Sequence, residues 1–586
     1  MRSLLSIALL SVLLVFPTPA QEFYPLSEVR AGQQGVGKTV FQGTQIEEFG
    51  VEILGVLENV GPKQSLILAR LSGPQIDKTG VMAGMSGSPV YIDGRLVGAI
   101  AFSFPFATEP LAGIRPIADM VAGSSAPSTR PAALALDRSP ALLAMRGDVD
   151  ALLPPQIVVA SADTLTPIAT PIAFGGFTAR TLEVFGDQLR GLGLRPVQGI
   201  GGASSIEDNS PIQPGSMITV GLIRGDLNVN ASGTVTYVDG QRVHAFGHAF
   251  LSTGPARLPM MRSNVLASVP SLQNSFKLVG AGSVVGSINL DRTTGVVGTL
   301  GASPELTPFR ISVNSPGDQR TYDLEIVRDP VLTPFLVQMA IFASIDATER
   351  QVGGLTLQFD GEVALRGMPS LNLDGFYSGP STVGQLASLN TAAALAFLMQ
   401  SGPDAPEVEA INLTITVRPE DRRARILRAS AKTSRIQAGD TIQLNAIVRL
   451  PDGSEQVETV DWLVPISAAP GPLKITFSDA ASLNTLDYPL LFEASRLSPQ
   501  RLVQSLNALR RSDRLYMRVW RPQRGLRIQA ERLSSPPASL RAILDNPRGA
   551  AGGAAPEATS TIYEAVVGSY DALIEGQQTI EVTIVP

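Results

Sequence analysis

A serine held between glycines is the residue of this 586-residue chain best suited to chemistry. It is Ser86, in "GVMAGMSGSPVYIDGRLVGAIA", residues 80–101. A serine hydroxyl attacks a carbonyl only when a base accepts its proton and N–H donors stabilise the resulting oxyanion. Because Gly84 has no Cβ, its N–H can point with that of Ser86 toward one position. The turn predicts a nucleophile, Ser86, and an oxyanion hole formed by Gly84 and Ser86; a glycine-serine turn without chemistry is the alternative.

The base that such a serine needs can only be one of two histidines, His244 and His248, both in "RVHAFGHAF". The residues alone leave this choice open. The absence of cysteine excludes thiolate nucleophiles, disulfides and cysteine-ligated metals. Two histidines offer little for a zinc site. We therefore expect no metal and no cofactor.

Charge and motifs also limit the partners. A net charge of −6 provides no basic face for a phosphate backbone, so we expect no nucleic-acid partner. The segment "GQQGVGKT", residues 32–39, matches the pattern of a phosphate-binding loop. Such a loop must be followed by a helix, whereas the next residues favour strands. We interpret it as a glycine turn between strands and expect no nucleotide.

Two β-rich blocks dominate the first part of the chain. Each contains an Asp-Gly pair typical of a two-residue hairpin turn, in "YIDGRLVGAIAF" (91–102) and "YVDGQRVHAFGH" (237–248). The two stretches share Tyr, Asp, Gly, Val and Ala at matching places. They are either two related β-barrels that each contribute catalytic groups, or two Asp-Gly hairpins that look alike by chance.

The predicted organisation is mainly β. Helices are expected at 382–400 and 497–513, the second capped by Ser498 and ending in Arg510 and Arg511, to which we assign no partner. The predicted segments are a signal peptide (1–20), a first barrel segment carrying the serine (21–122), a linker (123–155), a second barrel segment carrying the histidine (156–350), strands plus a helix (351–403), an immunoglobulin-like β-sandwich (404–480) and a small α+β region (481–586).

The first twenty residues have the pattern of a secretory signal: Arg2, then an apolar run from Leu4 to Phe16, then the small residue Ala20 before Gln21. The apolar run is shorter than the ~20 residues that a membrane-spanning helix needs. We expect cleavage, no transmembrane segment in the mature chain, and a periplasmic or secreted protein.

Residues 79–120, "TGVMAGMSGSPVYIDGRLVGAIAFSFPFATEPLAGIRPIADM", resemble the nucleophile segment of the SpoIVB-type serine peptidases. Residues 233–254 and 284–301, "GTVTYVDGQRVHAFGHAFLSTG" and "VVGSINLDRTTGVVGTLG", are similar to the histidine segment of that family. The resemblance covers roughly the first 350 residues. It implies a trypsin-like double β-barrel assembled from two segments.

The resemblance implies that Ser86 is the nucleophile and that His248, which follows a glycine, is the general base. His244 matches no functional position, and its place in "RVHAF" suits a strand residue. The family also has an aspartate upstream of the serine that orients the histidine, but residues 69–72 here read Ala-Arg-Leu-Ser, and Asp77 is the nearest carboxylate. Loss of such a partner costs about 10⁴-fold in rate in an intact triad. The serine also precedes the histidine here, the reverse of the family order.

Two functions follow. The first is an exported SpoIVB-like serine endopeptidase that cleaves itself or another envelope protein, with a protein or peptide as substrate. The alternative is a catalytically degenerate peptidase fold that serves as an extracytoplasmic binding or scaffold protein; the missing aspartate favours it.

Overall fold

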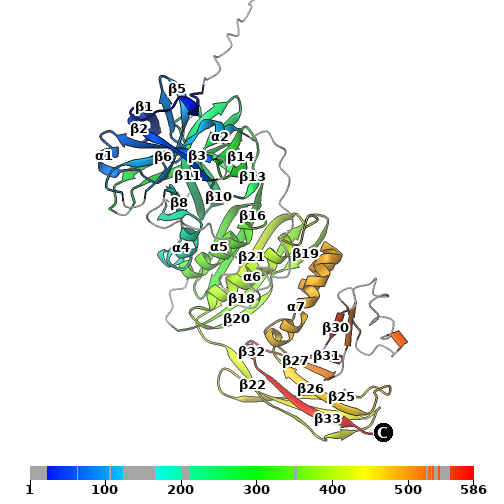
Figure 1. Ribbon diagram of the computed structural model, residues 1–586. Helices are drawn as coiled ribbons and strands as arrows, with labels where there is room; N and C mark the ends of the chain where they lie inside the picture. Colours follow the sequence, from blue (N-terminus) through cyan, green and yellow to red (C-terminus); the bar gives the residue numbers. More distant parts are fainter. Residues whose placement is uncertain are drawn as a thin grey trace, which may run out of the picture.

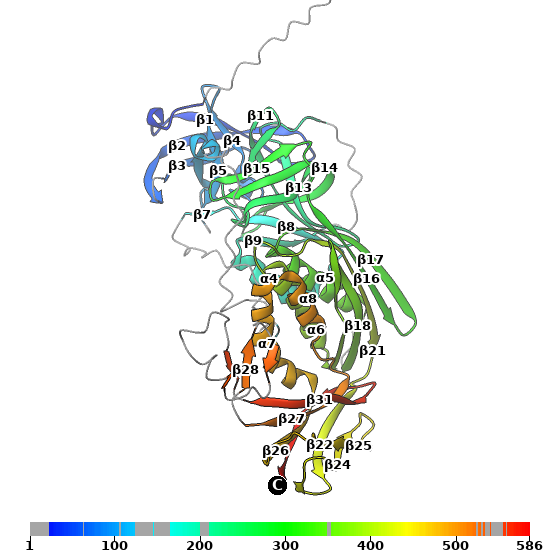
Figure 2. The same cartoon turned by 90° about the vertical axis from the view of Figure 1, so that its right-hand side faces the viewer.

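The chain folds into an elongated molecule with its barrels at one end and its C-terminal sheets at the other (Figures 1 and 2). The structure, a computed structural model, describes residues 23–586 except 62–63, 105–106, 123–144, 146–164, 200–209, 273, 349–352, 523–524, 529–530, 534–538, 541–554 and 558. The predicted signal peptide, 1–20, and all but residue 145 of the predicted linker, 123–155, lie outside this range.

The first region is a closed antiparallel barrel of six strands. A seventh strand, β7, pairs with β5 outside the ring. The core holds buried Phe49, Ile53, Ile67 and Ile100. The elements are η1 (Leu26–Glu28), β1 (Gln34–Val40), β2 (Ile46–Gly61), β3 (Gln64–Ser72), α1 (Ile76–Thr79), β4 (Pro89–Ile92), β5 (Arg95–Ser103), β6 (Leu111–Pro116), α2 (Ile117–Val121) and β7 (Thr166–Pro167).

The segment that matched the phosphate-loop pattern is strand β1, so the turn predicted for residues 32–39 is wrong for most of its length. Gly37 lies opposite Phe49 of β2. A Cβ at Gly37 would come within 2.2 Å of the Phe49 ring. This glycine is therefore needed for packing across the strand pair, and a strand, β2, follows it instead of a helix.

A second ring of six antiparallel strands lies within a 14-stranded sheet, because β10 pairs with β11 as well as with β13. The ring runs β10-β13-β14-β15-β12-β11. It consists of β10 (Met217–Gly225), β11 (Asn228–Asp239), β12 (Arg242–Ala245), β13 (Gly254–Val269), β14 (Phe276–Arg292) and β15 (Gly295–Leu300).

The same sheet continues past the ring on both sides. Helices α4, α5 and α6 share one apolar core with it, in which Phe185 of α4 packs edge-on against Phe335 and Phe342 of α5. Helix α6 confirms the helix predicted for 382–400. The elements are β8 (Thr170–Gly175), α4 (Ala179–Gly191), β9 (Leu194–Gln198), β16 (Leu306–Ser315), β17 (Asp318–Val327), α5 (Leu332–Thr348), β18 (Gly354–Leu365), β19 (Met368–Asn372), β20 (Gly375–Pro380), α6 (Val383–Met399) and β21 (Val408–Arg418).

Strand β21 lies between β16 and β18, although its residues were assigned to the start of the sandwich. Two further sheets, of four and five strands, share one core that includes Ile426, Leu444, Phe477 and Val582. The two sheets thus draw strands from both the predicted sandwich and the predicted C-terminal region. They contain β22 (Arg423–Ala431), β24 (Thr441–Arg449), β25 (Glu455–Leu463) and β32 (Leu573–Glu575), and β23 (Arg435–Ile436), β26 (Gly471–Ser478), β27 (Arg514–Arg521), β31 (Ser560–Ser569) and β33 (Gln577–Ile584).

Helices α7 (Ala480–Leu497) and α8 (Pro499–Asn507) separate the strands of these sheets along the chain. The Ser498 hydroxyl accepts a hydrogen bond from the Arg501 N–H, which confirms the predicted cap. Arg510, to which no partner was assigned, pairs with Asp487 and Glu564 after α8 has ended. Between β27 and β31 the chain forms a small three-stranded sheet, with β28 (Gly525–Ile528), β29 (Glu531–Leu533) and β30 (Ala555–Glu557).

Candidate active site

The turn that carries Ser86 is held in shape by two glycines with left-handed backbone. Gly84 has φ 97° and Gly87 has φ 92°, values that residues with a side chain rarely adopt. The Gly87 N–H donates to Ile100 O at 2.7 Å, and the Ser88 N–H donates to Met85 O at 2.9 Å. The hairpin β4–β5 that follows turns at Asp93 and Gly94, with φ 49° and 77°, as predicted.

This turn is docked on strand β11 of the second ring. Ser86 O accepts from the Thr234 N–H at 2.8 Å, and the Thr234 hydroxyl donates to Gly84 O at 3.0 Å. The Thr236 hydroxyl donates to Gly87 O at 2.7 Å. A Cβ at Gly87 would lie 1.9 Å from Thr234 O, so only glycine allows this approach. The close contact fixes the serine turn against the second ring.

The segment that carries His248 meets the same strand residue. Phe246 N–H donates to Thr234 O at 3.2 Å, so Thr234 bonds both the Ser86 and the Phe246 backbone. Phe246 and Gly247 have φ 71° and 72°. These two left-handed residues end β12 and turn the chain before His248. Residues 162 positions apart in the sequence are thereby brought to neighbouring backbone segments.

His248 is buried, with 4% of its surface exposed. Its Nδ1 lies 2.7 Å from Ala249 O. A carbonyl only accepts, so Nδ1 carries the proton and Nε2 presents its lone pair. Burial, followed by the nearby Arg115 charge, lowers the pKa of His248 to about 4. The imidazole is therefore neutral at pH 7, which is the form that a general base requires.

Ser86 Oγ and His248 Nε2 are both buried, and neither has a hydrogen-bonding partner within the described ranges. The N–H groups of Gly84 and Ser86 likewise bond no acceptor in the part of the chain that the structure covers. Buried polar groups without partners are costly in an ordinary interior. A hydroxyl, a basic nitrogen and two N–H donors left free on adjoining segments are the groups that acyl transfer uses.

The other predicted residues lie elsewhere. Asp77 is exposed on α1, where its carboxylate accepts from the Gly73 N–H, and it does not meet the His248 imidazole. His244 lies in β12 with its ring tilted against Tyr237 at 5.9 Å. Burial also lowers the pKa of His244 to about 4. The structure brings His248, and not Asp77, to the serine segment.

Lys277 is a residue near the serine turn that no sequence motif marks. Its N–H donates to Ala83 O at 3.0 Å, and its side chain would touch a Cβ on Gly84 at 3.3 Å. Its Nζ donates to the Thr39 hydroxyl at 2.7 Å. Burial lowers the pKa of Lys277 to about 7, and distant Glu47 only partly opposes this. Lys277 thus stabilises the backbone of the predicted oxyanion turn through its bond to Ala83 and its packing beside Gly84.

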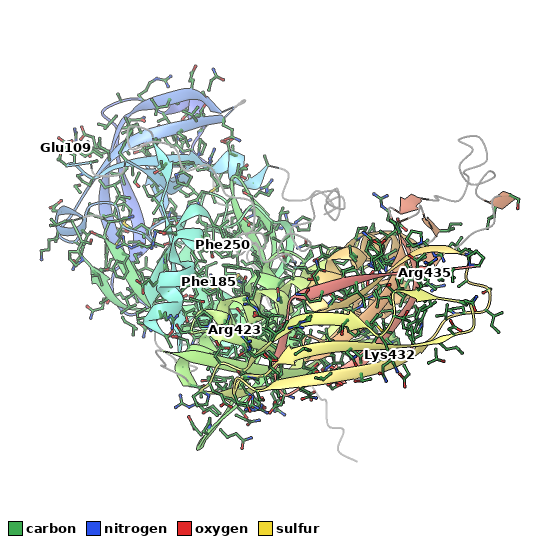
Figure 3. All side chains as sticks on the ribbon, turned by 90° about the horizontal axis from the view of Figure 1, so that it is seen from below. Glu109, Phe185, Phe250, Arg423, Lys432 and Arg435 are labelled. Carbon is green, nitrogen blue, oxygen red and sulfur yellow. The ribbon has the colours of Figure 1, made fainter. Side chains whose placement is uncertain are left out.

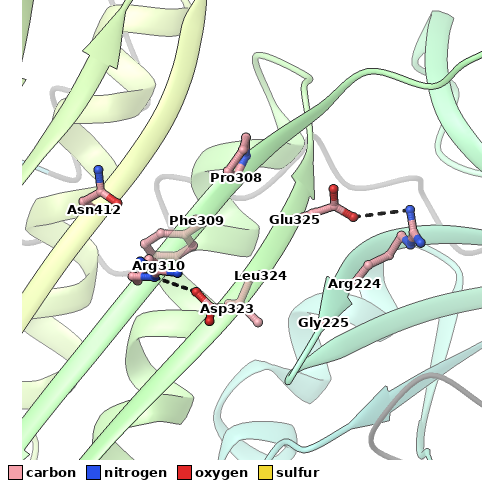
Figure 4. A pocket seen from close by; sticks show the side chains of 9 residues that line it. All are labelled: Arg224, Gly225, Pro308, Phe309, Arg310, Asp323, Leu324, Glu325 and Asn412. Atoms are coloured by element: carbon pink, nitrogen blue, oxygen red, sulfur yellow. Dashed lines mark hydrogen bonds and ion pairs between the residues drawn. The ribbon is translucent and has the colours of Figure 1, made fainter.

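Among the residues described, no group of His, Asp or Glu is arranged to hold a metal ion. None of the described helices is both long and apolar enough to span a bilayer. A cavity of about 580 Å³ lies on the 14-stranded sheet, between β10, β16, β17 and β21 (Figure 4). Arg224 there pairs with Glu325, and Arg310 pairs with Asp323. None of its lining residues belongs to the serine or histidine segment.

Comparison with known proteins gives one match. Residues 21–115 match the family model of the SpoIVB peptidase S55 family. This range contains Gly84 and Ser86 but stops short of His248. No curated protein and no solved structure matches the chain. The match confirms the resemblance of the serine segment to the SpoIVB-type serine peptidases, and it does not extend to the histidine segment at 233–301.

Proposed function

We propose that the chain is an exported serine endopeptidase in which Ser86 is the nucleophile and His248 the general base. The observation that carries the proposal is the pair of free buried atoms, Ser86 Oγ and His248 Nε2, on segments that both bond Thr234. The family match of residues 21–115 supports the reaction class. The two six-stranded rings support a trypsin-like double barrel, with the serine on one ring and the histidine beside the other.

In the proposed reaction, Ser86 Oγ bonds the carbonyl carbon of a peptide while its proton passes to His248 Nε2. The carbonyl oxygen becomes an oxyanion that the free N–H groups of Gly84 and Ser86 stabilise. The imidazolium then gives its proton to the leaving amine as the C–N bond breaks. Water, deprotonated by Nε2, attacks the acyl-enzyme and releases the acid and Ser86. The step requires no cofactor.

The resting site is closed, because Ser86 is fully buried and His248 nearly so. A peptide must displace neighbouring groups before its carbonyl can reach Oγ. This favours a protein or peptide substrate that binds over an extended length, since only then is there enough binding energy to open the site. The chain itself and another envelope protein are the proposed substrates. The signal-like residues 1–20 are the basis for proposing a periplasmic or secreted location.

A fluorophosphonate probe tests the proposal, since it reacts covalently with an activated serine. We expect the mature chain to be labelled at Ser86, and Ser86→Ala and His248→Ala to lose labelling, by on the order of 10⁶-fold for a residue of the triad. Ser88→Ala and His244→Gln are matched controls, because Ser88 Oγ and His244 Nδ1 are also buried without partners. If wild type labels no better than Ser86→Ala, the chain is not a peptidase and the scaffold alternative remains.

A further inference from the structure

Asp291 is a buried carboxylate close to the histidine segment. It lies near the end of β14 and is 1% exposed. Phe250, one of its partners, is buried, and in the view of Figure 3 it lies between Glu109 and Lys432. No salt bridge joins Asp291 to a basic side chain in the described part of the chain.

The partners of Asp291 are backbone N–H groups of the loop that follows His248. Its Oδ1 accepts from the Phe250 N–H at 2.8 Å. Its Oδ2 accepts from the Leu251 N–H at 2.7 Å and from the Thr253 N–H at 3.1 Å. Because each partner donates, the arrangement suits an ionised carboxylate, which only accepts. Burial raises the pKa of Asp291, and these hydrogen bonds oppose that shift.

One peptide group joins Asp291 to the imidazole. The peptide between Ala249 and Phe250 donates its N–H to Asp291 Oδ1 and accepts the His248 Nδ1–H on its carbonyl. A peptide unit is planar, so fixing its N–H also fixes the direction of its C=O. Hydrogen bonds in such a chain also polarise one another in a low-dielectric interior.

We propose that Asp291 is the positioning acid of this site, acting on His248 through the Ala249–Phe250 peptide. This inference rests on the proposed function. It accounts for the lack of a carboxylate at residues 69–72 and for the location of Asp77 away from the imidazole. The carboxylate holds the peptide carbonyl against Nδ1, which keeps the proton on Nδ1 and leaves Nε2 free to serve as the base.

The two histidines make this testable by NMR of the mature chain labelled with ¹⁵N-histidine, because only two imidazoles contribute signals. His244→Gln assigns the remaining signals to His248. We expect wild type to show His248 with the proton on Nδ1. Asp291→Asn should shift His248 toward a mixture of tautomers and leave His244 unchanged. Asp291→Asn should also lower the rate of fluorophosphonate labelling by about 100-fold, less than the ~10⁴-fold for an acid in direct contact.

Asp329→Asn is the matched control. Asp329 is partly buried and accepts from two backbone N–H groups, those of Val331 and Leu332 at the start of α5. It should leave both His248 signals and labelling unchanged. The proposal is overturned if Asp291→Asn folds with the His248 tautomer of wild type. If wild type is not labelled at all, the peptidase function fails, but the tautomer measurement still decides the role of Asp291.

Discussion

The hairpins at 91–102 and 237–248 are alike in sequence but differ in structure. Both show a register shift just before the tyrosine, but the first turns at Asp93-Gly94, whereas in the second Asp239 pairs with Arg242 and the turn is Gly240-Gln241. In the first, β5 continues through Ala101 and Phe102 to Ser103. In the second, β12 stops at Ala245, because Phe246 and Gly247 adopt left-handed backbone. His248 thus occupies the place of Phe102 in the alignment, but it lies outside the strand.

The difference shows that a shared hairpin sequence determines neither the position of the turn nor the end of the strand. Phe246 is not a residue that favours φ 71°, and such a conformation costs roughly 1–3 kcal/mol. The surrounding structure holds it there: Phe246 is fully buried, its N–H bonds Thr234, and Gly247 O accepts from Arg115 Nε at 3.4 Å. Strain held in this way by long-range contacts is typical of functional sites.

Replacing His248 by the residue of the first hairpin should have the largest effect. His248→Phe removes the proposed base, so peptidase activity and probe labelling should fall to the level of Ser86→Ala. The reciprocal change, Phe102→His, places an imidazole in a continuous strand and should not restore activity in that variant. Labelling at a single probe concentration over time measures both; recovery of activity in the double variant would contradict the comparison.

Gly247→Ala, which copies Ala101 of the first hairpin, should have the next largest effect. Its φ of 72° disfavours alanine, and the new Cβ would lie 3.0 Å from Ala101 Cβ. We expect labelling to fall by about 100-fold as His248 moves, and the free energy of unfolding to fall by about 1–3 kcal/mol.

Ala101→Gly tests how much the contact with Ala101 Cβ contributes to the defect of Gly247→Ala. Alone it should cost about 0.5–1 kcal/mol, as glycine does within a strand, and leave labelling unchanged. Combined with Gly247→Ala it removes the contact with Ala101 Cβ but leaves the contact with Ala99 Cβ at 3.1 Å and the backbone strain, so most of the labelling defect should persist. Full recovery in the double variant would show that the contact, and not the left-handed conformation, matters.

The two hairpins should also differ in how they contribute to the pH dependence of stability, because only the second hairpin carries histidines. Burial holds the pKa values of His244 and His248 at about 4, below the usual 6.5. The unfolded chain therefore binds more protons between pH 6.5 and 4, and stability falls as pH drops through this window. His244→Gln and His248→Phe should each flatten the fall measured by urea unfolding. An unchanged slope in both would refute the burial of neutral imidazoles.

On the serine side of the comparison, the pH dependence of stability should come from Lys277. Its surroundings are Thr39, Met217 and the Phe41 ring, with Glu47 farther away. Because its pKa is lowered from 10.5 to about 7, the unfolded chain binds more protons between pH 7 and 10.5. Wild-type stability should rise over this range relative to Lys277→Met, as thermal unfolding would show. Parallel curves for the two proteins would contradict a neutralised lysine.

The sequence alone determined the local features of this protein. The Asp93-Gly94 hairpin, the Ser86 turn and helix α6 follow from residue preferences that act over a few positions. The turn predicted at Asp239-Gly240 is wrong by one residue, because Asp239 pairs with Arg242 and the turn is Gly240-Gln241. Helix α8 shows the limit: its cap was predictable, whereas its end at Asn507, short of the predicted 513, goes with the ion pairs of Arg510 to Asp487 and Glu564. Strand β21 likewise takes its place in the large sheet from partners about 50 and 100 residues away.

Only the tertiary structure decided which groups meet. The docking of the Ser86 turn on Thr234, the left-handed turn before His248, and the link from Asp291 through the Ala249–Phe250 peptide all join distant parts of the chain. Backbone hydrogen bonds make these links, and every residue except proline offers the same N–H and C=O groups. Residue types therefore indicate the proposed nucleophile and limit the proposed base to two histidines, but they carry no signal for the proposed acid, which would act through a peptide.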